Sequence, residues 1–168
     1  MSTFTIDIRR AGSKDASSIA AVHDASWREA YSGIIPAKAL QRMVQRRGVS
    51  WWATALRRGV EILVLEVGDD IVGYATMGRN RVATLDYDAE IYEIYLKPEY
   101  QGLGFGRRLF QATRQALASQ GRKRVIVWAL SDNERAEAFY HGLGGRAVAT
   151  GHEAFDGEQL EKCAYAWH

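Results

Sequence analysis

The sequence has little cysteine and little proline, with one cysteine, Cys163, and two prolines among 168 residues. A single thiol excludes an internal disulfide and a cysteine-rich zinc site, so a reducing compartment is favoured and we expect a cytoplasmic protein. No apolar run reaches the length that spans a membrane, and the N-terminus does not resemble a signal peptide. We therefore expect no membrane partner.

An excess of charge of one sign is also missing, because 22 basic residues face 20 acidic residues and leave a net charge of +2. That balance excludes the strongly basic surface of a nucleic-acid-binding protein, so we expect no nucleic-acid partner. The four histidines show no metal-ligand spacing, and we expect no metal. The length and the apolar content of 47% are typical of one domain, residues 1–168, with one buried core.

What the sequence does contain is a strand, a glycine-rich turn and the start of a helix in direct succession. Residues 90–97 are mostly β-branched and aromatic, which predicts a strand that Pro98 ends. Three glycines follow at alternate positions, and a helical pattern begins at Arg107. Turn amides and the positive end of a helix dipole form an anion site, and glycines let a phosphate approach the backbone.

Two common nucleotide motifs do not fit this turn. The dinucleotide fingerprint needs its third glycine one residue after Gly106, and the nucleotide P-loop needs Lys and then Ser or Thr where this chain has Arg107 and Arg108. The pattern that fits is Gln-x-x-Gly-x-Gly, formed by Gln101, Gly104 and Gly106. With a proline upstream, it resembles the acetyl-CoA signature of the GNAT N-acetyltransferase superfamily.

The resemblance implies an acetyl-CoA-dependent N-acetyltransferase with a mixed, mostly antiparallel central sheet flanked by helices. The predicted order of elements, β-α-α-β-β-β-α-β-α-β-β, is that of a mixed α/β sheet. Besides the central strand, we expect strands at residues 5–10, 60–67, 71–78, 125–130, 146–151 and 160–167. Three alternatives stay open: a turn without a ligand, a CoA-binding module without catalysis, and a nucleotide-dependent enzyme.

A second block of resemblance lies in the predicted helix that begins at Ser131. Ser131 and Glu134 have the spacing of a capping box, so the side chain of Asn133 need not cap the helix. Asn133 and Tyr140 are about two helical turns apart and share a face. The residues that carry the resemblance are Asn133, Ala136, Ala138, Phe139, Tyr140, Leu143 and Gly144. Gly145 departs from it, because Phe is common there.

The resemblance implies a role for each of the two polar side chains in this helix. Asn133 would bind the pantetheine amide of the cofactor. Tyr140 would donate a proton to the departing CoA thiolate, which is a poor leaving group near neutral pH. The alternatives are an exposed asparagine in the first turn and a core tyrosine whose hydroxyl is satisfied.

Acyl transfer also needs a base, donors to the oxyanion and contacts to the pyrophosphate. Glu90 and Glu93 are candidates for the base, because a carboxylate on a core strand is costly unless it is used or ion-paired. They lie on opposite faces of an ideal strand, and the resemblance favours Glu90. It also implies oxyanion and pantetheine contacts from the backbone of Ile94, Tyr95 and Leu96. The further expected contacts to CoA are Gln101, Gly102, Leu103, Gly104, Phe105, Gly106 and Arg107.

The acceptor amine is expected between the first helices and the sheet. Trp27 and Tyr31, together with Trp51 and Trp52, either line that site or belong to the core. Residues 27–36 also resemble a bacterial GNAT subgroup whose members mostly lack an assigned substrate. We expect a small-molecule amine or a peptide N-terminus as the acceptor. Many members of the superfamily dimerise, so a homodimer is also an expectation.

Overall fold

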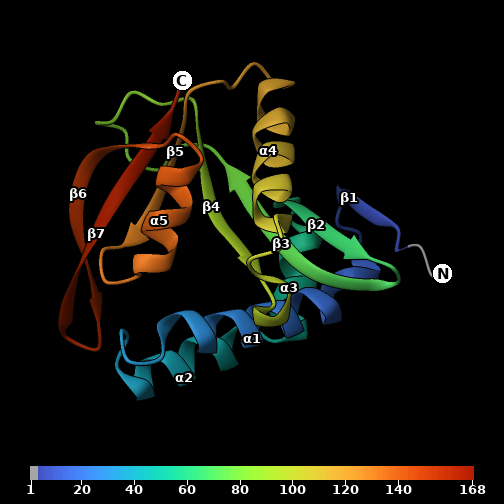
Figure 1. Ribbon diagram of the computed structural model, residues 1–168. Helices are drawn as coiled ribbons and strands as arrows, with labels where there is room; N and C mark the ends of the chain where they lie inside the picture. The colour runs from blue at the N-terminus through green and yellow to red at the C-terminus, as the bar shows by residue number, and fades with distance from the viewer. Residues whose placement is uncertain (1–3) are drawn as a thin grey trace.

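The computed structural model describes residues 4–168, which form a seven-stranded sheet in the order β1-β2-β3-β4-β5-β7-β6 with helices packed against it (Figure 1). The strands are β1 (Ile6–Arg10), β2 (Glu61–Val67), β3 (Asp70–Gly78), β4 (Ala89–Leu96), β5 (Val125–Leu130), β6 (Arg146–Phe155) and β7 (Glu158–Trp167). The α-helices are α1 (Ala16–Tyr31), α2 (Ala37–Arg46), α3 (Val49–Arg57), α4 (Phe105–Ala118) and α5 (Glu134–Gly142). All neighbouring strands pair antiparallel except β4 and β5. The predicted mixed, mostly antiparallel sheet flanked by helices is confirmed.

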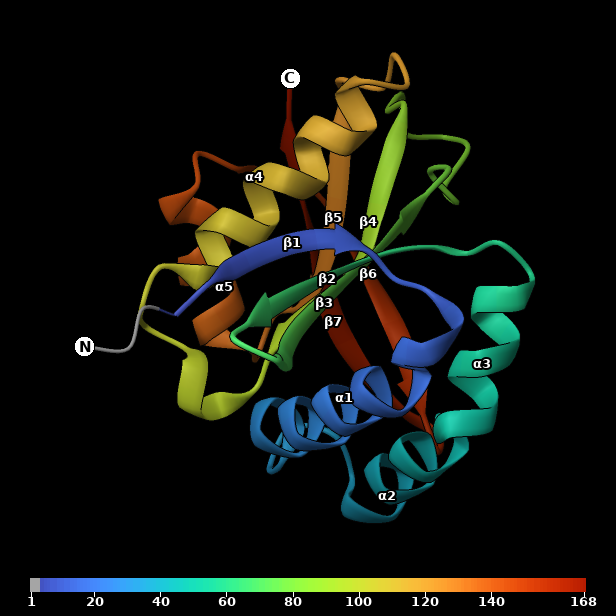
Figure 2. The same ribbon diagram turned by 90° about the vertical axis from the view of Figure 1, so that its right-hand side faces the viewer.

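Helices cover both faces of the sheet. On one face, α4 and α5 bury apolar side chains that include Leu109 and Tyr140. On the other face, α1 and α3 do the same with Ile19 and Trp52. Figure 2 shows α1 and α2 together below the sheet and α4 above it. The tip of the β6–β7 hairpin reaches this lower layer, because Phe155 packs in a cluster with residues of α1 and α2.

The central strand β4 has very different neighbours on its two sides. Its pairing with β3 extends along most of its length, but its pairing with β5 is limited to residues 89–91 opposite residues 125–127. Beyond Ile91 the two strands part, and within the described chain residues 92–96 have no strand partner on the β5 side. The sheet therefore consists of two halves, β1–β4 and β5–β7–β6, with a notch between them.

A β-bulge in β4 changes which side chains share a face. Glu90 lies opposite Gly78 and Glu93 lies opposite Thr76, so three steps along β4 match two steps along β3, with Tyr92 as the extra residue. Two residues of β3 that are two positions apart share a face, and so do their cross-strand partners. The expectation that Glu90 and Glu93 lie on opposite faces is therefore wrong, because an ideal strand lacks the extra residue.

The N-terminus of α5 also differs from the expectation. Asn133 is the N-cap, and its Oδ1 accepts the backbone N–H of Ala136 at 3.2 Å. Ser131 instead donates its hydroxyl to Glu161 at 2.9 Å, and its backbone N–H bonds to the same residue. The predicted Ser131–Glu134 capping box is wrong because pairing with β7 holds Ser131 outside the helix, and Asn is an equally good cap.

This assignment predicts which substitution weakens α5. Asn133→Ala should lower the free energy of unfolding by about 1 kcal/mol, because an N-cap hydrogen bond is lost, whereas Asn133→Asp should change it little. Urea unfolding without ligand measures both variants. Ser131→Ala is the matched control and should cost less, and a larger loss for Ser131→Ala than for Asn133→Ala would restore Ser131 as the cap.

Candidate active site

The first cavity at the notch is a cleft of about 660 Å³ between the open edge of β4, the glycine-rich turn and α5. Most of the predicted cofactor residues, and the predicted acid, line it: Ile94, Tyr95, Leu96, Gln101, Gly102, Gly104, Gly106, Arg107, Asn133 and Tyr140. Two predicted residues do not. The side chain of Leu103 is 65% exposed outside the cleft, and Phe105 packs against the apolar core.

The turn requires glycine at its three glycine positions for two different structural reasons. Gly102 and Gly104 have φ values of 76° and 86°, a left-handed conformation that side chains disfavour. Gly106 allows close packing instead, because a Cβ there would lie 3.0 Å from the Phe139 ring of α5. The turn leads into α4, whose first N–H groups have no partner inside the helix. These amides and the helix dipole make an anion site at the cleft.

Polar contacts connect the walls of the cleft. Gln101 donates its amide to the carbonyl of Leu96 at 3.2 Å, which holds the turn against the end of β4. Arg135 of α5 donates through Nη1 to Gln101 at 2.6 Å and to Glu29 of α1 at 3.2 Å. The turn, α5 and α1 are thereby held at fixed positions around the cleft.

Tyr140 lies in the cleft wall with 6% of its surface exposed. Its ring packs against Tyr165 and Trp167 at centroid distances of 5.6 Å and 5.8 Å. Burial raises the pKa of its hydroxyl above the usual range, so Tyr140 is protonated at neutral pH and can donate a proton. Tyr140 is thus both a core residue and a cleft residue.

The second cavity, of about 420 Å³, lies on the opposite face, between the first helices, β3, β4 and the β6–β7 hairpin. Aromatic side chains dominate its wall: Trp27, Tyr31, Trp51, Trp52, Tyr92, Tyr95, Trp128 and Phe155. Trp27 and Tyr31 are each 8% exposed, so they line this cavity and also belong to the core. Tyr95 contributes to the walls of both cavities, which therefore lie on either side of it at the open edge of β4.

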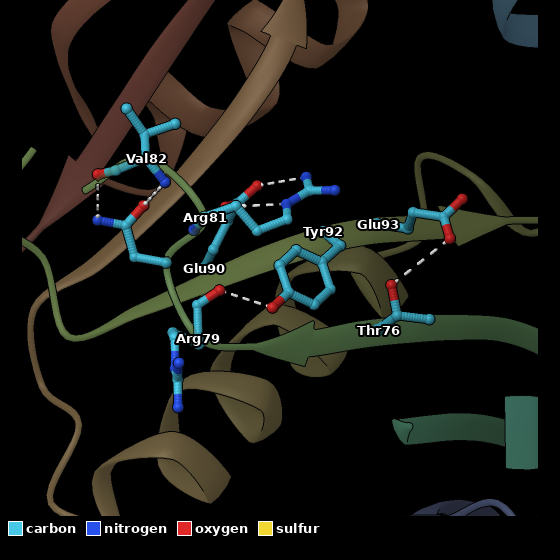
Figure 3. A network of polar contacts seen from close by, with 8 residues as sticks. Thr76, Arg79, Arg81, Val82, Glu90, Tyr92 and Glu93 are labelled. Atoms are coloured by element: carbon cyan, nitrogen blue, oxygen red, sulfur yellow. Dashed lines mark hydrogen bonds and ion pairs between the residues drawn. The ribbon is translucent and has the colours of Figure 1, made fainter. Parts of the chain in front are cut away.

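The two candidate carboxylates have different surroundings (Figure 3). Glu93 lines the second cavity, where Nη1 of Arg47 contacts both of its oxygens at 2.7 Å and the hydroxyl of Tyr74 donates at 3.3 Å. Glu90 is 1% exposed and does not line it. Glu90 accepts from the backbone N–H of Arg81 at 3.1 Å and from Nη2 of Arg81 at 2.6 Å. Only Glu93 of this pair therefore faces the open space.

Sequence reasoning missed several charged residues of the second cavity. Arg47 follows α2, Arg81 comes from the loop after β3, and Lys162 comes from β7. Each lies in an ordinary polar segment, so no local pattern marks it as a cavity residue. Only the packing of distant segments brings these cations to one wall.

His23 is buried beneath this wall. It is 0% exposed, and its ring packs against Trp27 at a centroid distance of 4.6 Å and edge-on against Trp52 at 5.8 Å. Within the described chain, neither ring nitrogen has a hydrogen-bond partner. Burial and, to a smaller extent, the charge of Arg47 lower the pKa of His23 to about 3, so the ring is neutral at pH 7.

Residues 4–168 contain no cluster of three or more His, Cys, Asp or Glu side chains that could hold a metal ion. No helix in this range is both long enough and apolar enough to cross a membrane.

The profile of the Acetyltransferase (GNAT) family matches residues 20–144. The chain is 30% identical over 162 residues to the uncharacterised N-acetyltransferase YuaI of Bacillus subtilis, covering 96% of this chain and 92% of that protein. The chain therefore belongs to the GNAT family. It is an acetyl-CoA-dependent N-acetyltransferase by class.

Solved structures share the fold at low identity. The PaiA N-acetyltransferase of Thermoplasma acidophilum, solved in complex with coenzyme A, superposes with a TM-score of 0.76 at 19% identity, covering 97% of this chain and 99% of that chain. The yncA protein of Salmonella typhimurium, solved with acetyl-CoA, gives a TM-score of 0.69 at 19% identity, covering 97% and 93%.

The burial of His23 predicts a pH-dependent stability. Folded His23 stays neutral down to about pH 3, whereas an unfolded histidine gains a proton below about pH 6.5. Below pH 6.5 the unfolded state therefore binds more protons than the folded state. The stability that neutral His23 contributes is fully present above pH 6.5, and it is lost as the pH falls, by up to about 1.4 kcal/mol per pH unit. Urea unfolding at pH 7.5 and 5.0 should show a smaller loss for His23→Phe than for the natural protein.

The control for this prediction is His152→Gln, because His152 lies exposed on β6. Its pH dependence should match that of the natural protein. Parallel losses in His23→Phe and the natural protein would mean that His23 binds protons equally in both states.

Proposed function

We propose that this acetyltransferase moves the acetyl group of acetyl-CoA directly onto a primary amine, with both substrates bound at once. The observation that carries the proposal is the shared wall at Tyr95. A thioester in the first cleft and an amine in the second cavity would meet at the open edge of β4. Structural neighbours solved with CoA and acetyl-CoA support the choice of cofactor.

The first cleft has candidate donors for the pyrophosphate and for a pantetheine carbonyl of the cofactor. The amides of the turn and of the first residues of α4, including those of Leu103 and Phe105, are the proposed contacts to the pyrophosphate. Asn133 uses Oδ1 to cap α5, which leaves its amide N–H groups to donate to a pantetheine carbonyl. Arg107 lines the same cleft and adds positive charge near the phosphates.

The open edge of β4 offers backbone donors for the oxyanion. The N–H of Lys97 bonds to Val72 on the β3 side at 2.8 Å. Successive N–H groups along a strand point to opposite sides, so those of Leu96 and Ile94 point away from β3. They point toward β5, where no strand pairs with them in the described chain. The carbonyl of Leu96, which accepts from Gln101, indicates the same orientation. These amides are the proposed donors to the tetrahedral intermediate.

The proposed proton transfers use one residue in each cavity, a base in the second cavity and an acid in the first cleft. Glu93 accepts the proton of the amine, directly or through one water, because it faces the second cavity while Glu90 does not. The neutral amine nitrogen then attacks the thioester carbon, and collapse of the tetrahedral intermediate breaks the C–S bond. Tyr140 gives its proton to the departing sulfur. The nitrogen loses its second proton to water as the amide forms, and exchange with water restores the phenol and the carboxylate.

Tyr140→Phe tests the proposed acid. The variant should keep its thermal stabilisation by acetyl-CoA while kcat falls by about 100-fold or more, because general acid catalysis contributes that much. Thiol release across an amine panel measures kcat. Tyr165→Phe is the matched control, since Tyr165 packs on Tyr140 outside the cleft, and it should keep its activity. Unchanged turnover in Tyr140→Phe would exclude it as the acid. Stabilisation by NAD or ATP alone would exclude the CoA site.

Glu93→Gln and Glu90→Gln together test the base. Glu93→Gln should lower kcat/KM by about 100-fold, because the amide cannot accept the proton, and the loss should shrink as rising pH deprotonates the free amine. Glu90→Gln should lower it less, because its carboxylate only holds Arg81. A pH-dependent loss confined to Glu90→Gln would move the role to Glu90.

A further inference from the structure

The guanidinium of Arg47 is only partly used by the protein. Its Nη1 donates to both carboxylate oxygens of Glu93, each at 2.7 Å. Among residues 4–168, no hydrogen-bond acceptor contacts its Nε or Nη2, although the side chain lines the second cavity and is 27% exposed. A guanidinium has five donors in a rigid fork, so the Nε–Nη2 edge of Arg47 is left for a ligand.

Aromatic side chains hold this guanidinium in place. Its central carbon lies 4.5 Å from the ring centroid of Trp51, 5.4 Å from that of Trp27 and 5.9 Å from that of Trp52. The contact with Glu93 fixes a fourth direction. Because these contacts order the side chain before a ligand arrives, a ligand that binds the free edge pays little for ordering it.

The cavity wall has balanced charges, but its cations keep donors that an acid group can use. Three cations, Arg47, Arg81 and Lys162, and two anions, Glu93 and Glu153, line the cavity. Arg47 and Arg81 each have a carboxylate partner. Lys162 lies 4.8 Å from the ring centroid of Trp128, and no carboxylate in the described chain lies within ion-pair distance of it. With Glu90, the partner of Arg81, included, three cations face three carboxylates, so the wall offers a polyamine no excess of negative charge.

We propose that the acceptor is a small amine that also carries a carboxylate, as an amino acid does, and that this carboxylate binds the Nε–Nη2 edge of Arg47. The inference rests on the proposed function, because it names the acceptor of that reaction. Planar guanidinium and carboxylate groups match in a bidentate contact. The apolar body of the acceptor packs against the aromatic wall.

Matched pairs of amines with and without the acid group test this proposal. Phenylalanine with phenethylamine, tryptophan with tryptamine, and leucine with isoamylamine are assayed for thiol release and for the mass of the N-acetyl product. In the natural protein, kcat/KM should be at least about tenfold higher for the carboxylated member, because a bidentate charge-assisted contact is worth at least that factor. Affinity for each compound is followed separately by the quenching of tryptophan fluorescence.

Substitutions of Arg47 connect the preference to this residue. In Arg47→Gln and Arg47→Lys, the ratio of kcat/KM within each pair should fall toward one, because both lack the fork. The ratio is the readout, since losing the contact to Glu93 affects both members of a pair alike. Arg42→Gln is the matched control: Arg42 lies on α2 outside this cavity, pairs with Asp156 and should keep the full preference. Thermal unfolding verifies that each variant is folded.

Each outcome has a separate meaning. Acetylation with equal kcat/KM within the pairs, or a preference that survives Arg47→Gln, overturns the carboxylate inference and leaves the proposed function standing. Acetylation of peptides without that of any free amino acid also overturns it. Failure of acetyl-CoA to stabilise the protein overturns the proposed function. In that case the fluorescence titrations still decide, because equal or absent binding of the carboxylated members overturns the inference.

Discussion

The structure depends above all on the parting of β4 and β5 after their short parallel contact. Each strand keeps its other neighbour, β3 for β4 and β7 for β5, so neither half of the sheet loses its own pairing. The cost is a stretch of β4 backbone whose polar groups have no strand partner in the described chain, and such groups need water or a ligand. A cavity lies on each face of the sheet at this parting, and Tyr95 lines both cavities. A single interruption of the ladder thus provides both the binding space and the donors.

The bulge at Tyr92 has the next largest effect. It places Glu90 and Glu93 on the face of the second cavity, and each is neutralised by an arginine from outside the strand. Removing one partner from such a pair leaves a charge without compensation, which costs far more than the net gain from the pair. The arginines are therefore needed structurally by the carboxylates. What they can offer a ligand in the cavity is the set of N–H donors that the carboxylates leave unused.

Much of the fold and of the first cleft could be predicted from local patterns, because they follow from short segments. Periodicity predicts the strands, and the spacing of Gln101, Gly104 and Gly106 predicts the turn that lines the cleft. The bulge could not be predicted, because an extra residue is visible only against the partner strand. Gly145 shows the same limit. A Cβ there would lie 2.5 Å from the ring of Trp167, so a distant residue explains the local departure from the family pattern.

Three buried phenols at the junction of the cavities show why position decides chemical role. Burial raises the pKa of Tyr31 to about 12 and raises those of Tyr95 and Tyr140 as well, so all three are protonated at neutral pH. Protonation alone cannot identify the acid. The hydroxyls of Tyr31 and Tyr95 lie 2.5 Å apart and share one hydrogen bond. Both side chains line the second cavity. Tyr140 lines only the first cleft. Tyr31 lines only the second cavity and Tyr95 lines both, so in the proposed reaction Tyr140 is the phenol on the side of the departing thiol.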